Sequence, residues 1–368
     1  MEQIANLASL PFVFHHLAIM PDVHAGMGMP IGGVLPTVGA VIPNAVGVDI
    51  GCGMCAVKSS WRVEDIDKQQ LRDKIMPAIK AAIPVGFEHH ATAQDEKFMP
   101  QGYDIDSLKI VSAEYESARC QVGTLGGGNH FIELQRDEEG WLWVMIHSGS
   151  RNLGKKVCVH YDEIAAALNG LWHSQVRPEL HLAFLPMGTQ EFDDYWREMN
   201  YCVDFALCNR ALMMERIKSI LSESLAGIEF EPMINIAHNY AALENHYGHN
   251  VIVHRKGATM VREGVTGIIP GSQGTASYIV EGLGNPDSFC SCSHGAGRAM
   301  SRNKAKENLN LNDEIKRLDD QGIIHGITAV DDLDEAAGAY KDIETVINNE
   351  LDLVKIKTRL LPVAVIKG

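Results

Sequence analysis

The segment Gly47-Val-Asp-Ile-Gly-Cys-Gly-Met54 is the most informative stretch of this sequence, because it places a carboxylate and a thiol in a glycine-rich turn. Asp49 and Cys52 stand three residues apart, and the glycines around them allow both side chains to turn toward one point. A carboxylate and a thiolate are both ligands for divalent metals. A turn aspartate followed by a small buried thiol would give the same pattern, so the segment alone leaves both interpretations open.

Outward from this segment, strand-like and helical patterns alternate. Short apolar runs broken by glycine and proline predict strands and tight turns, whereas apolar residues at helical spacing predict helices. Strands are predicted within 1–60, 123–154, 250–254, 265–269 and the terminal LLPVAVIKG (360–368), and helices at 65–83, 190–225, 236–247 and 342–353. We therefore predict an α+β fold: a single large domain over residues 1–368, with mixed β-sheets flanked by helices around a central metal-containing cleft.

Composition limits the class of protein. A chain of 368 residues with 46% hydrophobic residues can bury a sizeable core. The net charge of −15 argues against long tracking along a nucleic-acid backbone, although an enzyme that handles only a strand end needs just a local basic pocket. Prolines and Asp49 interrupt the apolar stretch 34–57, and no basic leader is visible. We expect a cytoplasmic protein without a membrane partner.

The eight cysteines do not suggest a disulfide framework, and we expect most of them to be reduced and buried. Cys52-Gly-Met-Cys55 is a CxxC motif, which occurs in redox and zinc sites. No second CxxC completes a four-cysteine zinc site, and the βαβ pattern of a thioredoxin is missing. The motif therefore favours neither chemistry.

Three histidines stand in settings typical of functional side chains, directly before, within or after apolar elements: His130 in GGGNHFIEL, His147 in VMIHSGSRNLG and His238 in NIAHNYAALENH. A single histidine of this kind is more often structural. Together with Asp49 and Cys52, they predict a cluster for two divalent metals with a shared ligand, and ligand chemistry alone favours zinc. The other histidines are interpreted as surface or core residues, although His24 and His254 are expected near the site.

Four glycine- and serine-rich segments are suited to cradling phosphates with backbone N–H groups. They are GGGN (126–129), SGSRNLG (148–154), PGSQGTAS (270–277) and HGAGR (294–298). The P-loop pattern is absent, as is the KxDG lysine motif of ordinary nucleotidyl ligases. If the protein forms a nucleotidyl-enzyme, its nucleophile must be a different residue.

His294 is the candidate nucleophile. It precedes two glycines and Arg298, so its ring can approach a phosphate held by backbone amides. Neutral imidazole attacks phosphorus near pH 7, and the phosphoramidate that forms can transfer the bound nucleotide to a second acceptor. Arg298 or Arg302 would offset the growing negative charge. A histidine at a helix start without any chemistry is the alternative interpretation.

In combination, these segments resemble the RtcB family of RNA-splicing and repair ligases. The resemblance covers essentially the whole chain. It rests on MPDVHAGMGMPIGGV, GVDIGCGM, GGGNHFIEL, HSGSRNLG, AHN, PGSQGTAS, HGAGR and the terminal VIKG, which occur in this order.

The resemblance implies two Mn²⁺ ions, rather than zinc, bound by Asp49, Cys52, His130, His147 and His238 with Cys52 shared between them. It also implies guanylylation of His294 by GTP and contact of Arg151 with RNA phosphate, a role in which Arg298 and Arg302 are further candidates. The residues implied to contact the guanylate are Asn129, His130, Phe131, Ile132, Glu133, His238, Asn239, Pro270, Gly271, Ser272, Gln273, Ser277, His294, Gly295, Ala296, Gly297, Tyr340 and Lys367.

The implied reaction joins an RNA 3′-phosphate or 2′,3′-cyclic phosphate to a 5′-hydroxyl, through guanylylated histidine and an RNA(3′)pp(5′)G intermediate. The implied substrates are ends of cleaved transfer or ribosomal RNA. Two features depart from the family pattern: the N-terminal extension of longer members is missing, and Gln273 replaces a common methionine. The short form resembles a bacterial subgroup associated with a release-factor-like protein.

Two alternatives keep the same residues. A metal-dependent phosphoesterase or cyclic phosphodiesterase acting on RNA ends would use the same donor set, and only His294 and the guanylate loops distinguish it from a ligase. A non-catalytic ribosome- or RNA-binding factor is disfavoured, because the acidic balance offers no broad binding face.

Overall fold

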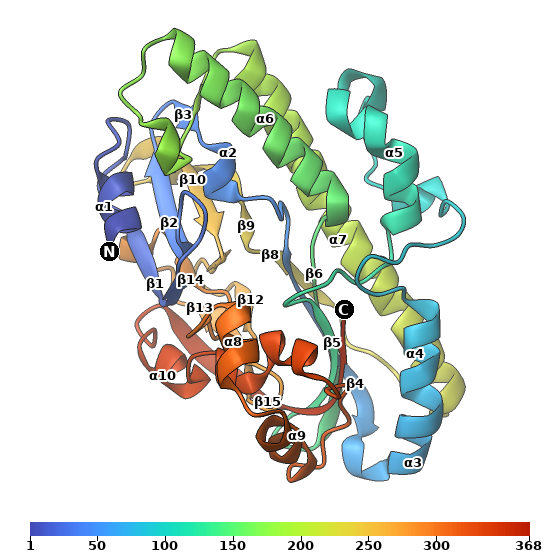
Figure 1. Cartoon of the computed structure of the whole chain (residues 1–368). Helices are drawn as coiled ribbons and strands as arrows, with labels where there is room; N and C mark the ends of the chain where they lie inside the picture. The colour runs from blue at the N-terminus through green and yellow to red at the C-terminus, as the bar shows by residue number, and fades with distance from the viewer.

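A seven-stranded antiparallel sheet collects strands from the whole length of the chain in this computed structural model, which describes residues 1–368. In order across the sheet they are β12 (Thr266–Ile269), β13 (Ser277–Gly282), β15 (Val354–Lys367), β5 (Phe131–Arg136), β6 (Trp141–Ser148), β4 (Gly53–Arg62) and β8 (Ile234–Ala237). Figure 1 shows the red C-terminal strand β15 beside the green β5, with the blue β4 further along the same sheet. Because the sheet mixes early and late strands, we infer that residues 1–368 form one domain.

A second, four-stranded sheet lies next to the first one (Figure 1). Its order is β1 (Ala18–His24), β2 (Ile31–Thr37), β10 (His249–Lys256) and β9 (Asn239–His246), and two short ribbons pair β11 (Ala258–Met260) with β14 (Ser291–Ser293) and β3 (Ala40–Val41) with β7 (Leu185–Pro186). The α+β class is confirmed. The expectation of mixed sheets needs correction, because all pairings between these strands are antiparallel and several neighbours are joined by hairpins.

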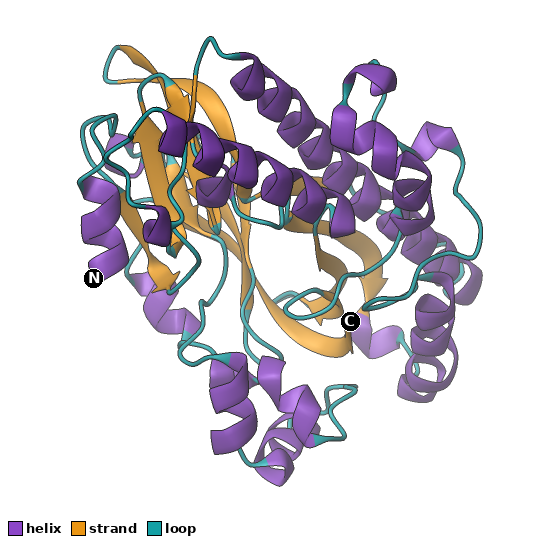
Figure 2. Ribbon diagram, turned by 45° about the horizontal axis from the view of Figure 1, so that its top comes forward, coloured by secondary structure: helices purple, strands orange, loops and turns teal.

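Helices cover one side of the seven-stranded sheet, as Figure 2 shows. The longest is α7 (Gln190–Ser224), which runs beside α6 (Arg151–Leu171). Met213, Met214, Ile217 and Leu221 of α7 pack with the apolar face of β4, β5 and β6 in one buried cluster. The remaining helices are α1 (Glu2–Ala8), α2 (Pro43–Val46), α3 (Lys68–Gln70), α4 (Met76–Ala82), α5 (Lys109–Gln121), α8 (Arg302–Asn308), α9 (Leu311–Asp319) and α10 (Ile343–Asn348). None of the helices combines the length and apolar character that crossing a membrane requires.

Most predicted elements are present. The helix expected at 190–225 is α7, whose first turn is capped by the Thr189 hydroxyl accepting from Phe192 N–H. The helix expected at 65–83 is continuous over 68–82, with a π-helical turn at Leu71–Ile75 just before Pro77. The helix expected at 342–353 ends early, at Asn348, and the terminal strand begins at Val354.

The helix predicted at 236–247 is wrong. This stretch forms the end of β8 and the whole of β9, with His238 between the two strands. Its alanines, leucine and glutamate favour a helix locally. Tertiary pairing decides otherwise, because β9 forms a hairpin with β10 through Tyr247-Gly248, both of which have positive φ.

A buried guanidinium fixes the helical layer to the strand ends. Arg210 of α7 is fully buried and donates to Asn235 Oδ1 at 2.7 Å, to the Ser148 carbonyl at 2.7 Å and to the Gly51 carbonyl at 3.0 Å. Its neighbour Asn209 accepts from the N–H groups of Gly123 and Thr124 and donates to the Gly149 carbonyl. These two residues therefore hold the loops that enter and leave β4, β5 and β6.

Replacing Arg210 with methionine tests this role. The change leaves the carbonyls of Gly51 and Ser148 without donors in a buried site, so we expect a loss of about 3 kcal/mol or more in the free energy of unfolding. Urea denaturation followed by circular dichroism measures it. Arg197→Met on the same helix is the control, because its exposed pair with Asp194 should contribute less than about 1 kcal/mol. Equal losses in both variants would contradict the proposed role of Arg210.

Candidate metal and nucleotide site

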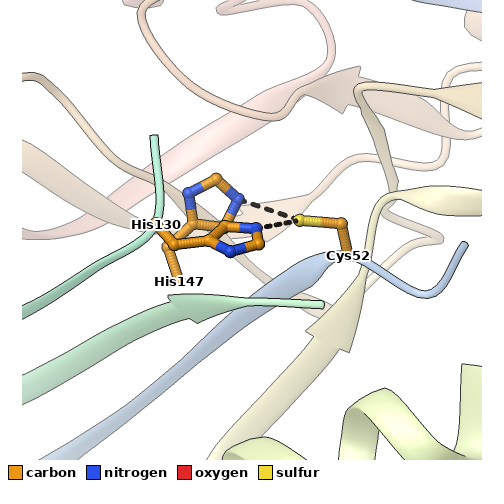
Figure 3. Close-up of side chains that lie close together, drawn as sticks. All are labelled: Cys52, His130 and His147. Atoms are coloured by element: carbon orange, nitrogen blue, oxygen red, sulfur yellow. Dashed lines mark hydrogen bonds between the residues drawn. The ribbon is translucent and has the colours of Figure 1, made fainter. Parts of the chain in front are cut away.

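Three donors converge at the ends of neighbouring strands. Cys52 directly precedes β4, His130 directly precedes β5, and His147 is the penultimate residue of β6. The Cys52 sulfur lies 3.3 Å from His130 Nε2 and 3.2 Å from His147 Nε2, and Figure 3 shows both rings aimed at the sulfur. The three donor atoms all lie within 4.8 Å of one another. The strand registers produce this cluster, since β6 pairs with β4 on one side and with β5 on the other.

The turn before β4 depends on glycine. Gly51 has a φ of +74°, and a Cβ at this position would approach the backbone of Val203 on α7 to 2.8 Å. The turn can therefore pack directly against the helix, with its carbonyl held by Arg210. This contact brings Asp49 and Cys52 to the same end of the strands as His147.

Asp49 and His238 adjoin the three-donor cluster. Asp49 Oδ2 lies 3.0 Å from His130 Nε2. His238, between β8 and β9, donates its backbone N–H to the Cys52 carbonyl at 2.8 Å, and its ring centroid lies 5.2 Å from that of His147. The structure therefore brings together all five residues predicted as metal ligands.

The protonation of these donors suits a cation. Burial lowers the pKa values of His147 and His238 well below their usual range, with nearby histidines adding to the effect, so both rings are neutral near pH 7. His147 Nδ1 donates to the Asn129 carbonyl at 3.2 Å, which leaves Nε2 as the donor atom facing Cys52. Burial, with the charge of Asp49, raises the pKa of the Cys52 thiol, so binding of a metal there would release a proton.

His294 lies next to this cluster but has a different partner. Its ring centroid is 4.8 Å from that of His238. Its Nδ1 donates to Asp22 Oδ2 at 2.6 Å, and its backbone N–H donates to the same oxygen at 3.1 Å. Nε2 is consequently the nitrogen with a free lone pair. Asp22 belongs to the MPDVHAGMGMPIGGV segment, but no role was predicted for it from the sequence.

These groups face a cavity of about 400 Å³. Of the predicted metal ligands, Asp49, Cys52, His147 and His238 line it, while His130 contacts the Cys52 sulfur but does not line the cavity. The predicted guanylate residues that also line it are Asn129, Phe131, Glu133, Asn239, Pro270, Gly271, Ser272, Gln273, His294, Gly295, Ala296, Gly297, Tyr340 and Lys367. His24 lines the cavity as expected, whereas His254 is buried in β10 and does not.

Besides His130, three predicted residues lie outside the lining. The Ile132 side chain packs into the core with α7, because successive residues of a strand face opposite sides and Phe131 and Glu133 face the cavity. Ser277 is buried and accepts from the Gly271 N–H. Arg151 is partly buried and donates to Thr124 and to the Gly86 carbonyl.

A buried glutamate that the sequence did not single out organises the far end of the cavity. Glu335 binds the Arg302 guanidinium at 2.7 Å, the Arg298 guanidinium at 3.1 Å and the Tyr340 hydroxyl. On the adjacent wall, burial raises the pKa of Glu133 to about 7, an effect that nearby Lys367 opposes. Cations are therefore present in the cavity although the chain as a whole is acidic.

Replacing Cys52 with serine tests the donor cluster. A hydroxyl is a weaker ligand than a thiolate, so we expect the variant to bind at least one Mn²⁺ ion fewer than the wild type. Native mass spectrometry after Mn²⁺ titration counts the bound ions. Cys120→Ser, which changes a partly buried thiol of α5 outside the cluster, should leave the count unchanged. An unaltered count in Cys52→Ser would remove Cys52 from the ligand set.

The known proteins that resemble this chain match it over its whole length and belong to one family. A family model described as tRNA-splicing ligase RtcB matches residues 3–368. The chain is 39% identical to the RNA-splicing ligase RtcB of Escherichia coli K12, covering 100% of this chain and 93% of that protein. It is 33% identical to the RNA-splicing ligase RtcB homolog 1 of Entamoeba dispar (100% and 81%) and 32% identical to the tRNA-splicing ligase RtcB of Archaeoglobus fulgidus (100% and 90%). The chain therefore belongs to the RtcB family of RNA-splicing ligases.

Proposed function

We propose that this chain joins an RNA end carrying a 3′-phosphate or a 2′,3′-cyclic phosphate to an end carrying a 5′-hydroxyl, with GTP as co-substrate. The placement of His294 is the observation that carries the proposal. Asp22 holds one ring nitrogen, and the other is free beside a cluster of metal-type donors in a cavity lined with glycine-rich loops. A hydrolase needs the donor cluster but has no need of such a nucleophile.

In this proposal Asp49, Cys52, His130, His147 and His238 would hold two Mn²⁺ ions, with Cys52 as the shared ligand. Two buried ring nitrogens in this set, Nδ1 of His130 and of His238, have no hydrogen-bond partner within the protein. When bound, the ions supply positive charge that stabilises the phosphate oxygens during displacement.

In the first step, Nε2 of His294 attacks the α-phosphorus of GTP. The N–P bond forms as the bond from the α-phosphorus to the bridging oxygen breaks, and pyrophosphate leaves. The ring acquires positive charge, which the Asp22 carboxylate stabilises through Nδ1–H. Backbone N–H groups of Gln273 and of residues 295–297, with Arg298 and Arg302, hold the phosphates.

In the next steps, an oxygen of the RNA 3′-phosphate attacks the guanylate phosphorus and releases His294. The 5′-hydroxyl oxygen of the second RNA end then attacks the former 3′-phosphate, the new phosphodiester bond forms, and GMP leaves. A 2′,3′-cyclic phosphate first reacts with water to give the 3′-phosphate. In this proposal the guanine base binds beside Tyr340, Glu133 and Lys367, which line the cavity, and the Glu133 carboxyl group accepts from guanine N–H donors.

Cleaved transfer or ribosomal RNA supplies the substrates in this proposal, and a release-factor-like protein is a proposed partner. Arg151 contributes to RNA phosphate binding near Asp49, whose charge acts on its guanidinium. An assay with RNA fragments ending in 3′-phosphate and 5′-hydroxyl, with and without GTP, separates the candidate activities. Sealing that requires GTP supports the ligase, whereas phosphate release without GTP and no sealing supports the phosphoesterase.

Replacing His294 with alanine removes the proposed nucleophile. We expect the wild type, given Mn²⁺ and α-labelled GTP, to take up an acid-labile, base-stable label, and we expect His294→Ala to take up none. Gel autoradiography after acid and base treatment measures the label. His249→Ala, at the exposed β9–β10 turn, should label normally. Label retained in His294→Ala would show that the nucleophile is another residue.

Replacing Asp22 with asparagine tests the orientation of the ring. An amide can donate to Nδ1 and so favour the tautomer that carries its proton on Nε2, the attacking nitrogen. By analogy with carboxylate–histidine pairs in other enzymes, we expect guanylylation to slow by about 100-fold or more. Single-turnover labelling measures the rate. If Asp22→Asn labels at the wild-type rate, Asp22 does not set the tautomer.

A further inference from the structure

Two buried carboxyl groups hold successive backbone N–H groups at the nucleophile. Glu350, just after α10, is completely buried, and its Oε2 accepts from Ser293 N–H at 2.8 Å. Asp22 of β1 is equally buried and accepts from the N–H and from Nδ1 of the next residue, His294. The position of the nucleophile is thus fixed from both ends of the sequence.

The second oxygen of each carboxyl group, Asp22 Oδ1 and Glu350 Oε1, is buried without a hydrogen-bond partner. Apart from Asp22, the titratable groups that act on Glu350 are Cys292 of β14 and Asp352, neither of which is a cation. The nearby Lys341 amine donates to the carbonyls of Pro21 and Val23. Two buried and adjacent negative charges without a paired cation are unfavourable, so one of the two groups keeps a proton.

The surroundings indicate which group keeps the proton. Asp22 accepts two N–H bonds, one of them from the imidazole ring, whereas Glu350 accepts one. Burial, with the negative charge of Asp22, raises the pKa of Glu350 to about 8. Glu350 is therefore the protonated member near pH 7.

We propose that Glu350 is a positioning residue for His294: it holds Ser293 N–H and, as a neutral acid, leaves Asp22 as the only charged carboxylate behind the imidazole ring. This inference rests on the proposed function, because it assigns Glu350 a part in the guanylylation step. Glu350 touches neither substrate nor cofactor and acts through Ser293 and Asp22. Ionisation of Glu350 would place a second negative charge behind a ring that must approach a triphosphate, and the two carboxylates would repel each other.

Single-turnover labelling with α-labelled GTP from pH 6.5 to 9 tests whether Glu350 affects the rate of guanylylation. Glu350→Ala leaves Ser293 N–H without its acceptor, and we expect guanylylation to slow about tenfold or more. Glu350→Gln should restore most of that rate, because its amide oxygen still accepts from Ser293. Wild-type protein should lose rate several-fold above about pH 8, and Glu350→Gln should lack this extra loss. Glu344→Gln, on α10 with an exposed side chain bound to Tyr278 and Arg359, should follow the wild type.

Thermal unfolding of metal-free protein from pH 5 to 9 tests whether Glu350 holds a proton, without relying on an activity assay. Because the folded-state pKa of Glu350 is raised, the folded protein binds this proton more tightly than the unfolded chain, so wild-type stability falls as pH rises toward about 8. The Tm of Glu350→Gln relative to wild type should therefore increase from pH 5 to about 8 and then level off.

The outcomes separate the two proposals. A flat Tm difference from pH 5 to 8, or an unchanged alkaline rate loss in Glu350→Gln, would overturn the role of the Glu350 proton. Normal labelling of Glu350→Ala would overturn its positioning role. If wild-type protein takes up no label, the proposed function fails, and the Tm series still decides whether Glu350 holds a proton.

Discussion

The contact of Arg210 with the Gly51 and Ser148 carbonyls is the interaction on which the site depends. One carbonyl belongs to the residue before Cys52, and the other to the residue after His147. A buried guanidinium is tolerated only where hydrogen-bond acceptors surround it. Here two of the acceptors are backbone carbonyls at the strand ends that carry the predicted metal ligands Cys52 and His147. The position of α7 thereby sets the separation of Cys52 and His147. Gly51 completes this constraint, because a larger residue would push the turn away from the helix.

His147 and His294, two histidines of the cavity, differ in the group that accepts a hydrogen bond from ring nitrogen Nδ1. His147 donates Nδ1–H to a neutral carbonyl, which orients the ring toward the Cys52 sulfur. His294 donates to a buried carboxylate, which can stabilise positive charge on the ring. The same side chain thus suits a metal ligand in one place and a nucleophile in the other, and the difference comes from groups that contact the far side of each ring.

The acidic chain still offers cations where a nucleotide would bind. Arg298 and Arg302 are held by Glu335, and Lys367, on which the charges of Glu335 and Glu133 act, lines the same cavity. Glu335 fixes the two guanidinium groups, so their positions are defined before a phosphate arrives. A local pocket of this kind is compatible with a net charge of −15, because an enzyme of strand ends needs few backbone contacts.

The sequence by itself determined the residue types of the site, the long helix at 190–225 and the α+β class. Glycine-flanked Asp49 and Cys52, the three histidines and His294 are recognisable because these segments occur together in one chain, whereas each segment alone also allows a structural interpretation. The helix predicted from the local pattern at 236–247 is wrong, because pairing of this segment with β10 and β4 outweighed its helix propensity. Arg210, Asp22, Glu335 and Glu350 have no local signature, because their roles come from partners tens or hundreds of residues away. Tertiary structure alone decided which charges are buried together, and those buried contacts determine which ring nitrogens face the cavity.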